Sequence, residues 1–427
     1  MTRMQLNIVA AVSVVATIAV LAGGVGAAGD NSALAKALAR QLSRTVTLPG
    51  SPAGPAARDL GADGASTIDS AADEPAPAAP NDDGGGFADA SGGGTQPTNG
   101  NIADEPPADS PPSRIKHVFV IALAGHGFDA TFGPSSPAPY LTGQLRPKGA
   151  LLTNYSSLGH GDLADLLALA GGQPPNADTS AGCPTYRDFP PMTKPKKSGE
   201  IVADGCVYPN TVTSLSDQVT SSGGSWRAYI EDLDQGPDGK SSCRHPASDA
   251  ADDTTRARPG DGYATRHNPF VYFHSLLDLG SCDANDVALG GLESDLRTAK
   301  DTPNLAFIAP NLCHDGTESP CADGSPGGIP AADAFLAEWA PKILDSPAYR
   351  KDGLLVITFA DSPDQTTPVG TLLVSQYADA GITNDAAWDP YSLLRSLEDL
   401  LGLDALARAA EADSFANTVL ARALPDY

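Results

Sequence analysis

The stretch 115-IKHVFVIALAGHGFDATFG-133 decides how the chain folds, because an apolar run in it stops abruptly at a turn of small residues. Residues 118–123 (VFVIAL) form the run, and residues 124–127 (AGHG) form the turn. A short apolar run of this kind is typical of a strand that is buried on both faces of a parallel sheet. Ligands bind beyond the carboxyl ends of such strands. The turn therefore stands where a functional site is expected, although Ala124 and Gly125 carry no group that binds a metal or moves a proton.

Three further apolar runs, at residues 305–308, 354–359 and 369–375, predict buried parallel strands of the same sheet. Helical patterns alternate with them. One begins at Asp162 with an acidic first turn and a glycine stop, and two amphipathic segments cover residues 331–346 and 390–403. Strands that alternate with helices predict an α/β fold, with a mostly parallel central sheet and helices on both faces.

The net charge of the chain limits the kinds of molecule that it can bind. The chain has 27 Lys and Arg against 52 Asp and Glu, a formal net charge of -25. An acidic surface repels nucleic acids and anionic lipids over most of its area. We therefore exclude nucleic-acid binding.

A hydrophobic share of 41% in 427 residues is ample for a sizeable core.

The first 112 residues divide into two segments of different composition. Residues 1–29 contain Arg3, an apolar run over residues 6–25 and small residues suited to cleavage, which indicates an export signal or an uncleaved membrane anchor. Residues 30–112 are rich in Pro, Gly, Ala and Asp, and we interpret them as a disordered linker. Residues 113–427 are then the folded domain. We expect an exported protein, secreted or anchored at the outer face of the cytoplasmic membrane or cell envelope.

Six cysteines follow the linker, and an even number in an exported chain indicates disulfides. The simplest hypothesis joins neighbours along the chain, namely Cys183 with Cys206, Cys243 with Cys282, and Cys313 with Cys321. The sequence leaves other pairings open. No C-x-x-C pair occurs, so a zinc site built from these cysteines is not expected.

Polar side chains follow the predicted strands and lie in the segments between them. They are His126 and Asp129 after the first strand, Asn311, His314 and Asp315 after the second, Asp361 after the third, His160 and Asp162 at a helix start, and His245 and His267 in the middle region. The carboxyl ends of parallel strands meet at one edge of a sheet, so the groups after the strands are expected to converge. Convergent His and Asp side chains suit a metal-assisted phosphoryl or ester hydrolase.

Seven segments in order carry a resemblance to a known family: IKHVFVI…FDATFG, SWRAYIEDL, CRHP, YATRHNPFVYFHS, TPNLAFIAPNLCHDG, WAPKILDSPAYRKDGLLVITF and YSLLRSLEDLLGL. Together they resemble the bacterial phosphoesterase family that includes phospholipases C and an acid phosphatase. The resemblance extends from Ile115 to about Leu403. It implies an alkaline-phosphatase-like fold, a divalent metal cofactor and a phosphomonoester or a phospholipid head group as substrate.

The same resemblance shows which expected metal ligands are missing. In active members the first strand is followed by E-N-x-S-F-D, whose Glu and Asn hold the metal, and here these positions are Ala124 and Gly125. The acid expected directly after LLVITF is Ala360, and the hydroxyl nucleophile falls on Asp162. Of five implied metal-site positions, only Asp162 and Asp361 keep a donor. Two carboxylates would hold a divalent ion weakly, since calcium takes roughly six to eight oxygen ligands.

Asp162 has two interpretations. It can act as a carboxylate nucleophile in a rearranged site, or it can cap its helix by accepting from free N–H groups of the first turn. We favour the cap, because an ionised carboxylate repels a phosphate when no metal screens it. His160, His245 and His267 match family positions and are candidate catalytic residues. Each also has a structural interpretation: His160 as a turn residue, His245 as a neighbour of a disulfide, and His267 as a residue that precedes an apolar segment.

The sequence therefore predicts an exported, disulfide-stapled phosphoesterase-family protein that is catalytically impaired. One alternative is an active hydrolase that uses Asp162, Asp361 and the histidines on a phosphoester or phospholipid head group. A second alternative is a binding or scaffold protein of the cell envelope. The N-terminal apolar run is a candidate membrane tether under each of these interpretations. A metal cofactor, which the family implies, is expected to be weakly bound or absent.

Overall fold

The computed structural model describes residues 113–159, 161–362 and 368–425, all of which belong to one unit, Asn99–Tyr427. The predicted signal or anchor (1–29) and linker (30–112) lie outside the described residues, as does His160. Within the described part of the chain, no helix is long and apolar enough to cross a membrane.

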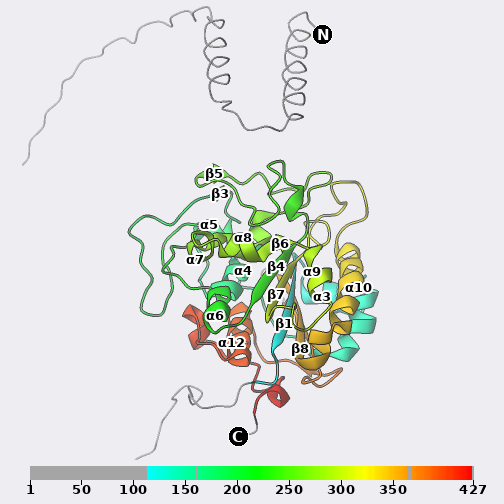
Figure 1. Ribbon diagram of the computed structural model, residues 1–427. Helices are drawn as coiled ribbons and strands as arrows, with labels where there is room; N and C mark the ends of the chain where they lie inside the picture. Colours follow the sequence, from blue (N-terminus) through cyan, green and yellow to red (C-terminus); the bar gives the residue numbers. More distant parts are fainter. Residues whose placement is uncertain (1–112, 160, 363–367, 426–427) are drawn as a thin grey trace, which may run out of the picture. The chain divides into compact units, whose positions relative to one another are not determined.

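The core of the molecule is an eight-stranded sheet with the order β10-β2-β9-β8-β1-β7-β4-β6 (Figure 1). A second sheet pairs β3 with β5. The strands are β1 (His117–Ala124), β2 (Ala150–Leu152), β3 (Thr185–Tyr186), β4 (Trp226–Ile230), β5 (Ala250–Ala251), β6 (Asp286–Ala288), β7 (Leu305–Ala309), β8 (Gly353–Ala360), β9 (Thr371–Val374) and β10 (Thr383–Asn384).

Strand β1, which contains the apolar run at 118–123, lies between β8 and β7 and is parallel to both. Every residue of β1 is buried. Helices cover both faces of this sheet, so a polar residue would have no solvated side to face, which explains the unbroken apolar run. The pairs β7–β4 and β4–β6 are also parallel. The predicted α/β fold with a mostly parallel central sheet is confirmed.

The strand predicted at residues 369–375 is real, but its predicted parallel direction is wrong. Strand β9 runs antiparallel to both of its neighbours, β8 and β2. Only residues 361–370 separate β8 from β9. A parallel return needs a crossover connection of roughly a dozen or more residues, usually with a helix, so this link is too short for it.

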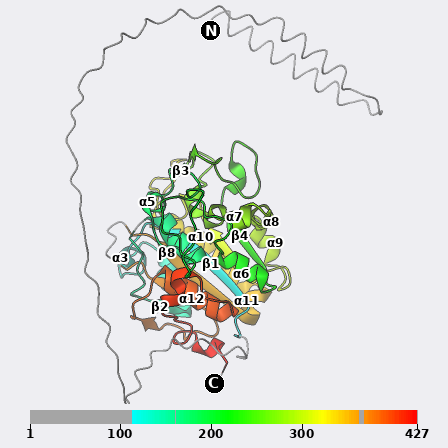
Figure 2. The same ribbon diagram turned by 90° about the vertical axis from the view of Figure 1, so that its left-hand side faces the viewer.

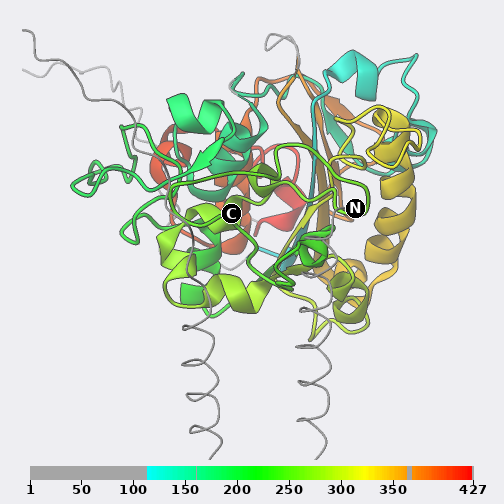
Figure 3. The same ribbon diagram turned by 90° about the horizontal axis from the view of Figure 1, so that it is seen from above.

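Helices lie on both faces of the sheet. Figure 3 shows α10 on one side of the strands and α4 and α12 on the other, and in Figure 2 α12 is on the side that faces the viewer. The helices are α3 (Phe128–Thr131), α4 (Asp162–Gly171), α5 (Ala177–Ser180), α6 (Leu215–Ser221), α7 (His274–Leu277), α8 (Ser281–Asn285), α9 (Gly291–Asp295), α10 (Ile329–Asp345), α11 (Pro347–Asp352) and α12 (Pro390–Leu401). The π-helical turn is η1 (Leu141–Leu145), and the 3₁₀ turns are η2 (Arg146–Lys148), η3 (Leu233–Gln235), η4 (Thr265–His267), η5 (Pro269–Tyr272), η6 (Ala407–Glu411) and η7 (Ala421–Ala423).

The sequence explains where α12 begins and ends. The Asp389 carboxylate accepts from the Ser392 N–H at 2.8 Å, and Pro390 occupies the first helical position, where no N–H is needed. Gly402 ends the helix in the left-handed conformation, with a φ of 69°. The apolar side of α12 packs on α4, so the two helices cover the sheet together.

The three predicted disulfides are confirmed: Cys183–Cys206, Cys243–Cys282 and Cys313–Cys321. All six cysteines are used. The last bridge closes a short loop that directly follows the carboxyl end of β7, so it constrains the edge of the sheet where the candidate site lies.

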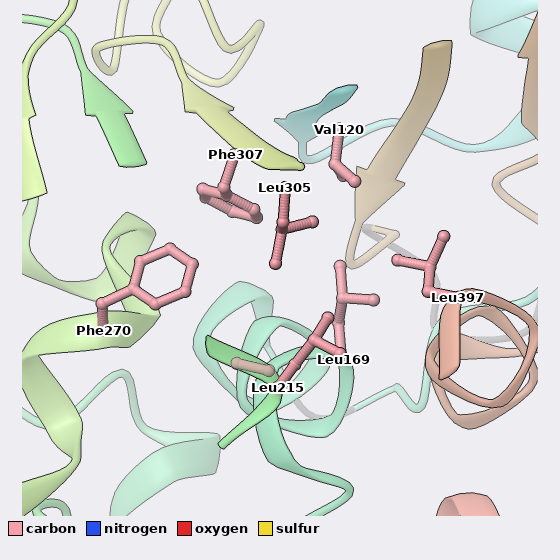
Figure 4. A pocket seen from close by; sticks show the side chains of 8 residues that line it. Val120, Leu169, Leu215, Phe270, Leu305, Phe307 and Leu397 are labelled. Atoms are coloured by element: carbon pink, nitrogen blue, oxygen red, sulfur yellow. The ribbon is translucent and has the colours of Figure 1, made fainter. Parts of the chain in front are cut away.

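A small cavity of about 10 Å³ lies between the sheet and its helices (Figure 4). Its lining is entirely apolar and consists of Val120, Leu169, Ala170, Leu215, Phe270, Leu305, Phe307 and Leu397. This volume is at the lower limit for one water molecule, and an apolar wall offers that water no hydrogen bond. The cavity is therefore a packing defect of the core rather than a binding site.

Candidate functional site

The carboxyl ends of β1 and β8 meet at the centre of the candidate site. Ala124 is the cross-strand partner of Ala360, and the Gly125 N–H donates to the Ala360 carbonyl at 3.0 Å. Ala124 and Ala360 are only 3% and 4% exposed. The three positions at which a family metal ligand is missing are thus neighbours in space. Their side chains are two methyl groups and, at Gly125, a hydrogen atom.

The loop after β7 lies directly against this pair of strand ends. The Ala124 N–H donates to the Asp315 carbonyl at 3.1 Å. His126 Nε2 lies 2.6 Å from the Gly316 carbonyl oxygen, which requires this nitrogen to be the donor. His126, a predicted site residue, is therefore bonded to the backbone of this loop.

Asp162 is the first residue of α4, and the N-cap is Gly161. Gly161 has a φ of 83°, a left-handed conformation that favours glycine. Asp162 is therefore not the N-cap residue, as its predicted capping role would require, because Gly161 occupies that position. Its Oδ1 nonetheless accepts from the Leu163 N–H at 2.8 Å, so one free donor of the first turn is satisfied by this carboxylate.

The other oxygen of Asp162 is held by two cationic side chains from η4. Asp162 Oδ2 lies 2.6 Å from His267 Nε2 and 2.9 Å from Arg266 Nε. The second nitrogen of His267, Nδ1, lies 3.1 Å from Asp315 Oδ2, an ion-pair contact without well-aligned hydrogen-bond geometry. His267 therefore bridges two carboxylates that come from different elements, the start of α4 and the loop after β7.

The pKa values of this bridge follow from its charges. Burial by itself lowers the pKa of His267, but the carboxylates of Asp162 and Asp315 outweigh burial and raise it to about 9. Burial by itself raises the pKa of Asp162, yet His267 and Arg266 hold that pKa well below its usual range. At neutral pH the bridge is a buried ion pair, in which Asp162 has no proton to lose and few free lone pairs for attack on phosphorus.

Asp361, the other remaining family acid, lies beside a second buried carboxylate. The Asp361 N–H donates to Asp165 Oδ2 at 2.8 Å, and the Leu158 N–H donates to Asp165 Oδ1 at 2.8 Å. Burial raises the pKa of Asp165 to about 7, although these two backbone bonds oppose the rise. The Asp361 backbone is left-handed, with a φ of 59°. Asp165 therefore uses both of its oxygens to hold the chain at the end of β8 and before α4.

The predicted catalytic histidines do not share one place. His267 is in the bridge, and His160 lies outside the described residues. His245 Nδ1 lies 2.8 Å from the Pro246 carbonyl, and its ring stacks on Tyr186 at 5.1 Å between centroids. Burial is the main cause that lowers the pKa of His245. These contacts match the structural role that the sequence left open for His245.

The predicted polar residues after β7 form a separate cluster with the end of β4. His314 Nδ1 lies 2.8 Å from Glu231 Oε1, and the Asn311 N–H donates to Glu231 Oε2 at 2.9 Å. Asn311 Nδ2 also donates to Asp232 Oδ2 at 2.8 Å. Of the three polar residues predicted after this strand, only Asp315 contacts the bridge.

The residues at the strand ends do not fit a divalent ion. Ala124, Gly125 and Ala360 supply no side-chain donor, and both oxygens of Asp162 already have protein partners. Over the described ranges, Cys243, Cys282 and Asp286 form the one group of three or more His, Cys, Asp or Glu residues whose ligand atoms lie close together. Its two cysteines form a disulfide, so this group does not offer thiolate ligands either.

Sequence reasoning missed three residues of this site: Asp165, Arg266 and Thr317. Asp165 lies one turn after Asp162 on α4, so the helical period placed it near the same strand ends. Arg266 directly precedes His267, but nothing in its sequence context indicates an acidic partner 104 residues earlier. Nothing in the sequence around Thr317 indicates that it would lie beside Gly125, which is far earlier in the chain.

One comparison with known proteins identifies a family for most of the chain. A family model described as the Phosphoesterase family matches residues 115–404. No curated protein matches the chain.

Among solved structures, a protein in the alkaline phosphatase superfamily from Vibrio parahaemolyticus is 13% identical, with 70% of each chain covered and a TM-score of 0.41. The PsFucS1 sulfatase from Pseudoalteromonas sp. is 12% identical, with 68% of each chain covered and a TM-score of 0.40. The lipoteichoic acid synthase LtaP from Listeria monocytogenes is 11% identical, with 68% of this chain and 74% of that chain covered and a TM-score of 0.40.

Proposed function

The chain belongs to the phosphoesterase family, and from that premise we propose that it is an exported member that has lost metal-dependent hydrolysis. Family membership and fold support descent from hydrolases of ester bonds. The proposal concerns what remains of that activity in this chain. In it, the protein binds a phosphoester or phospholipid head group, or another component of the cell envelope, without turning it over.

One observation carries the proposal: Ala124, Gly125 and Ala360 lie together at the edge of the sheet and provide no metal ligand. A metal ion in such a site polarises the phosphoryl oxygen and generates the nucleophile. Without ligands for it, both contributions are lost. The remaining family acids, Asp162 and Asp361, are too few for a hard cation that prefers about six or more oxygen ligands.

The state of Asp162 argues against an active, rearranged site. A carboxylate nucleophile needs a free lone pair directed at the substrate. The oxygens of Asp162 accept from the Leu163 N–H, His267 and Arg266 instead. The Asp162 side chain is 16% exposed, so an incoming phosphate would first have to break a largely buried ion pair.

Export is supported by composition and by the disulfides. Three disulfides staple the folded domain, and such bonds persist in oxidising compartments. The apolar run at residues 6–25 provides a signal or a membrane tether. We propose that the protein acts outside the cytoplasmic membrane, where an envelope component is its partner.

The test uses the full chain. Bound metal is measured on the purified protein, and hydrolysis of an aryl phosphate and of an aryl phosphodiester is assayed with Mg²⁺, Mn²⁺, Ca²⁺ or Zn²⁺. We expect no stoichiometric metal and no turnover above that of the Asp361→Ala variant. Asp413→Ala, a change at an exposed acid, is the matched control. Stoichiometric metal, together with turnover that Asp361→Ala abolishes and Asp413→Ala keeps, would show an active enzyme.

A further inference from the structure

The loop between Cys313 and Cys321, called here the plug loop (residues 313–321), follows β7 and lies over the end of β1. Three of its consecutive residues contact the site. Asp315 accepts from the Ala124 N–H and contacts His267, and Gly316 accepts from His126. The plug loop therefore occupies space at the edge of the sheet where a family member would hold its cofactor.

Thr317, the next residue of the plug loop, lies beside Gly125. A Cβ placed on Gly125 would lie 2.9 Å from Thr317 Cγ2, a separation that side chains essentially never adopt. The next nearest atoms of Thr317, Cβ and Cα, would lie at 3.8 and 3.9 Å, which is ordinary contact. One methyl group of Thr317 is therefore the nearest obstacle to a side chain at position 125, in addition to the strain of the positive φ of Gly125.

The Thr317 methyl cannot simply rotate away, because the hydroxyl on the same carbon is anchored. Thr317 Oγ1 donates to the Leu312 carbonyl at 3.1 Å and lies 2.8 Å from Asp315 Oδ1. The Thr317 N–H also donates to Asp315 Oδ1 at 2.6 Å. The hydroxyl has one proton for these two acceptors, so rotation about the Cα–Cβ bond would break one hydrogen bond, worth about 0.5–1.5 kcal/mol net.

The plug loop is also fastened at its far end. The Gly328 N–H donates to the Glu318 carbonyl at 2.7 Å, and the Ala257 N–H donates to Glu318 Oε1 at 3.1 Å. The Cys313–Cys321 disulfide closes the base of the loop. A movement of the whole plug loop that carries Thr317 away from Gly125 would therefore strain the hydrogen bonds of Glu318 and the disulfide at the same time.

We propose that the plug loop permanently occludes the inherited cofactor site, with Thr317 as the residue that excludes a ligand side chain from position 125. This inference deepens the proposed function, because it adds a steric block to the missing donors. It follows that restoring the donors alone does not restore metal binding. The block resides in one methyl group, so a single conservative substitution should remove it.

The first test measures thermal unfolding of full-length variants in a double-mutant cycle. Gly125→Ala is introduced into the wild type and into the Thr317→Ser and Thr317→Val backgrounds. Serine lacks the methyl and keeps the hydroxyl, whereas valine keeps the methyl and lacks the hydroxyl. We expect Gly125→Ala to lower the melting temperature clearly less in the Thr317→Ser background than in the other two.

The comparison between backgrounds also cancels the backbone strain that alanine causes at position 125. Gly125 has a φ of 73°, so any alanine there is strained, but this strain is the same in all three backgrounds. An equal loss of melting temperature in every background would overturn the steric role of Thr317.

The second test restores the donors with Ala124→Glu, Gly125→Asn and Ala360→Asp together, with or without Thr317→Ser. Mn²⁺ binding to each full-length protein is measured by calorimetry. We expect at least tenfold tighter binding when Thr317→Ser is present. Equal affinity with and without Thr317→Ser would overturn the plug, whether both proteins bind or neither does.

The two proposals fail in different ways. Stoichiometric metal and turnover in the wild-type chain would refute the proposed function. Tight Mn²⁺ binding by the donor-restored protein with Thr317 in place would refute only the plug. Should the donor-restored protein not fold, the thermal cycle on Gly125 and Thr317 decides the inference by itself.

Discussion

Ala124 and Ala360 are cross-strand partners at the carboxyl ends of β1 and β8, and both are buried. The family resemblance assigns an acidic metal ligand to each position. Two neighbouring carboxylates in a buried site repel each other unless a cation lies between them. Once the metal is lost, alanine at both positions removes that repulsion, which gives a physical reason for the two losses to occur together.

This reasoning predicts that Ala124→Glu and Ala360→Asp destabilise the protein more in combination than as the sum of the two single changes. The excess should be about 0.5–3 kcal/mol, the usual coupling between residues in contact. It should shrink as the pH falls toward 5, because one of the two acids then becomes protonated. Urea unfolding of the four proteins in EDTA measures it, and strictly additive losses would contradict the argument.

The Asp162–His267–Arg266 ion pair is predicted to matter for stability rather than for turnover. Asp162→Asn should lower the free energy of unfolding by about 3–5 kcal/mol, since it removes the carboxylate that Arg266 and His267 share and leaves His267 with Asp315 alone. Asp253→Asn is the matched control, because Asp253 is 64% exposed and pairs with Arg258 at 2.8 Å. An exposed pair contributes about 0–1 kcal/mol, so urea unfolding should separate the two variants. Similar losses for both would show that the buried bridge has no special role.

Glu398 is predicted to make stability depend on pH. It is fully buried on α12, its Oε1 accepts from the Leu406 N–H, and Oε2 has no hydrogen-bond partner among the described residues. Burial raises its pKa from 4.5 to about 8. Between these values the folded state keeps a proton that the unfolded state has lost, so this group's contribution to stability falls as the pH rises from 4.5 to 8.

The slope contributed by Glu398 is at most about 1.4 kcal/mol per pH unit. Glu398→Gln should remove it, because glutamine has a similar shape and does not ionise. Urea unfolding at several pH values from 5 to 8 compares the two proteins, with the exposed change Glu293→Gln as control. The prediction does not hold if Glu398→Gln and the wild type lose stability with pH at the same rate.

The disulfides are predicted to differ in their effect on stability according to the loop each one closes. Cys313–Cys321 spans 8 residues and Cys243–Cys282 spans 39. The loop-entropy relation gives about 2.5 kcal/mol for the short loop and about 4 kcal/mol for the long one. Replacing each pair with serine and measuring urea unfolding tests the order. A larger loss from the short loop would indicate that Cys313–Cys321 stabilises mainly through the contacts of the plug loop.

Much of the fold could be predicted from local sequence patterns. The apolar runs at residues 118–123, 305–308 and 354–359 became β1, β7 and β8, because a strand buried on both faces tolerates few polar residues. The acidic start and glycine stop of α4 and the amphipathic spacing of α12 also identified real helices. The direction of β9 was not predictable from its own residues, since it depends on the length of the link to β8 and on where β2 lies.

The candidate site also has features that the sequence predicted and features that it did not. Residue identity at Ala124, Gly125 and Ala360, set beside the family resemblance, was enough to predict that metal donors are missing. Nothing local indicated that Asp162 would find His267, which lies 105 residues away. The ion pair depends on the packing of η4 against the start of α4 and on the loop after β7.

The sequence by itself therefore determined the family, four of the eight strands of the central sheet, and the absence of donor side chains at Ala124, Gly125 and Ala360, because each of these depends on residue type and near spacing. It left the disulfide pairing open, with the observed pairing as the simplest hypothesis. Only the tertiary structure decided that the lost positions are neighbours, that a histidine and an arginine hold the remaining acid, and that Thr317 fills the space beside Gly125. Contacts of this kind depend on how distant segments pack against one another. Hydrophobic periodicity fixes which face of each element is buried, but it does not specify which side chains meet there.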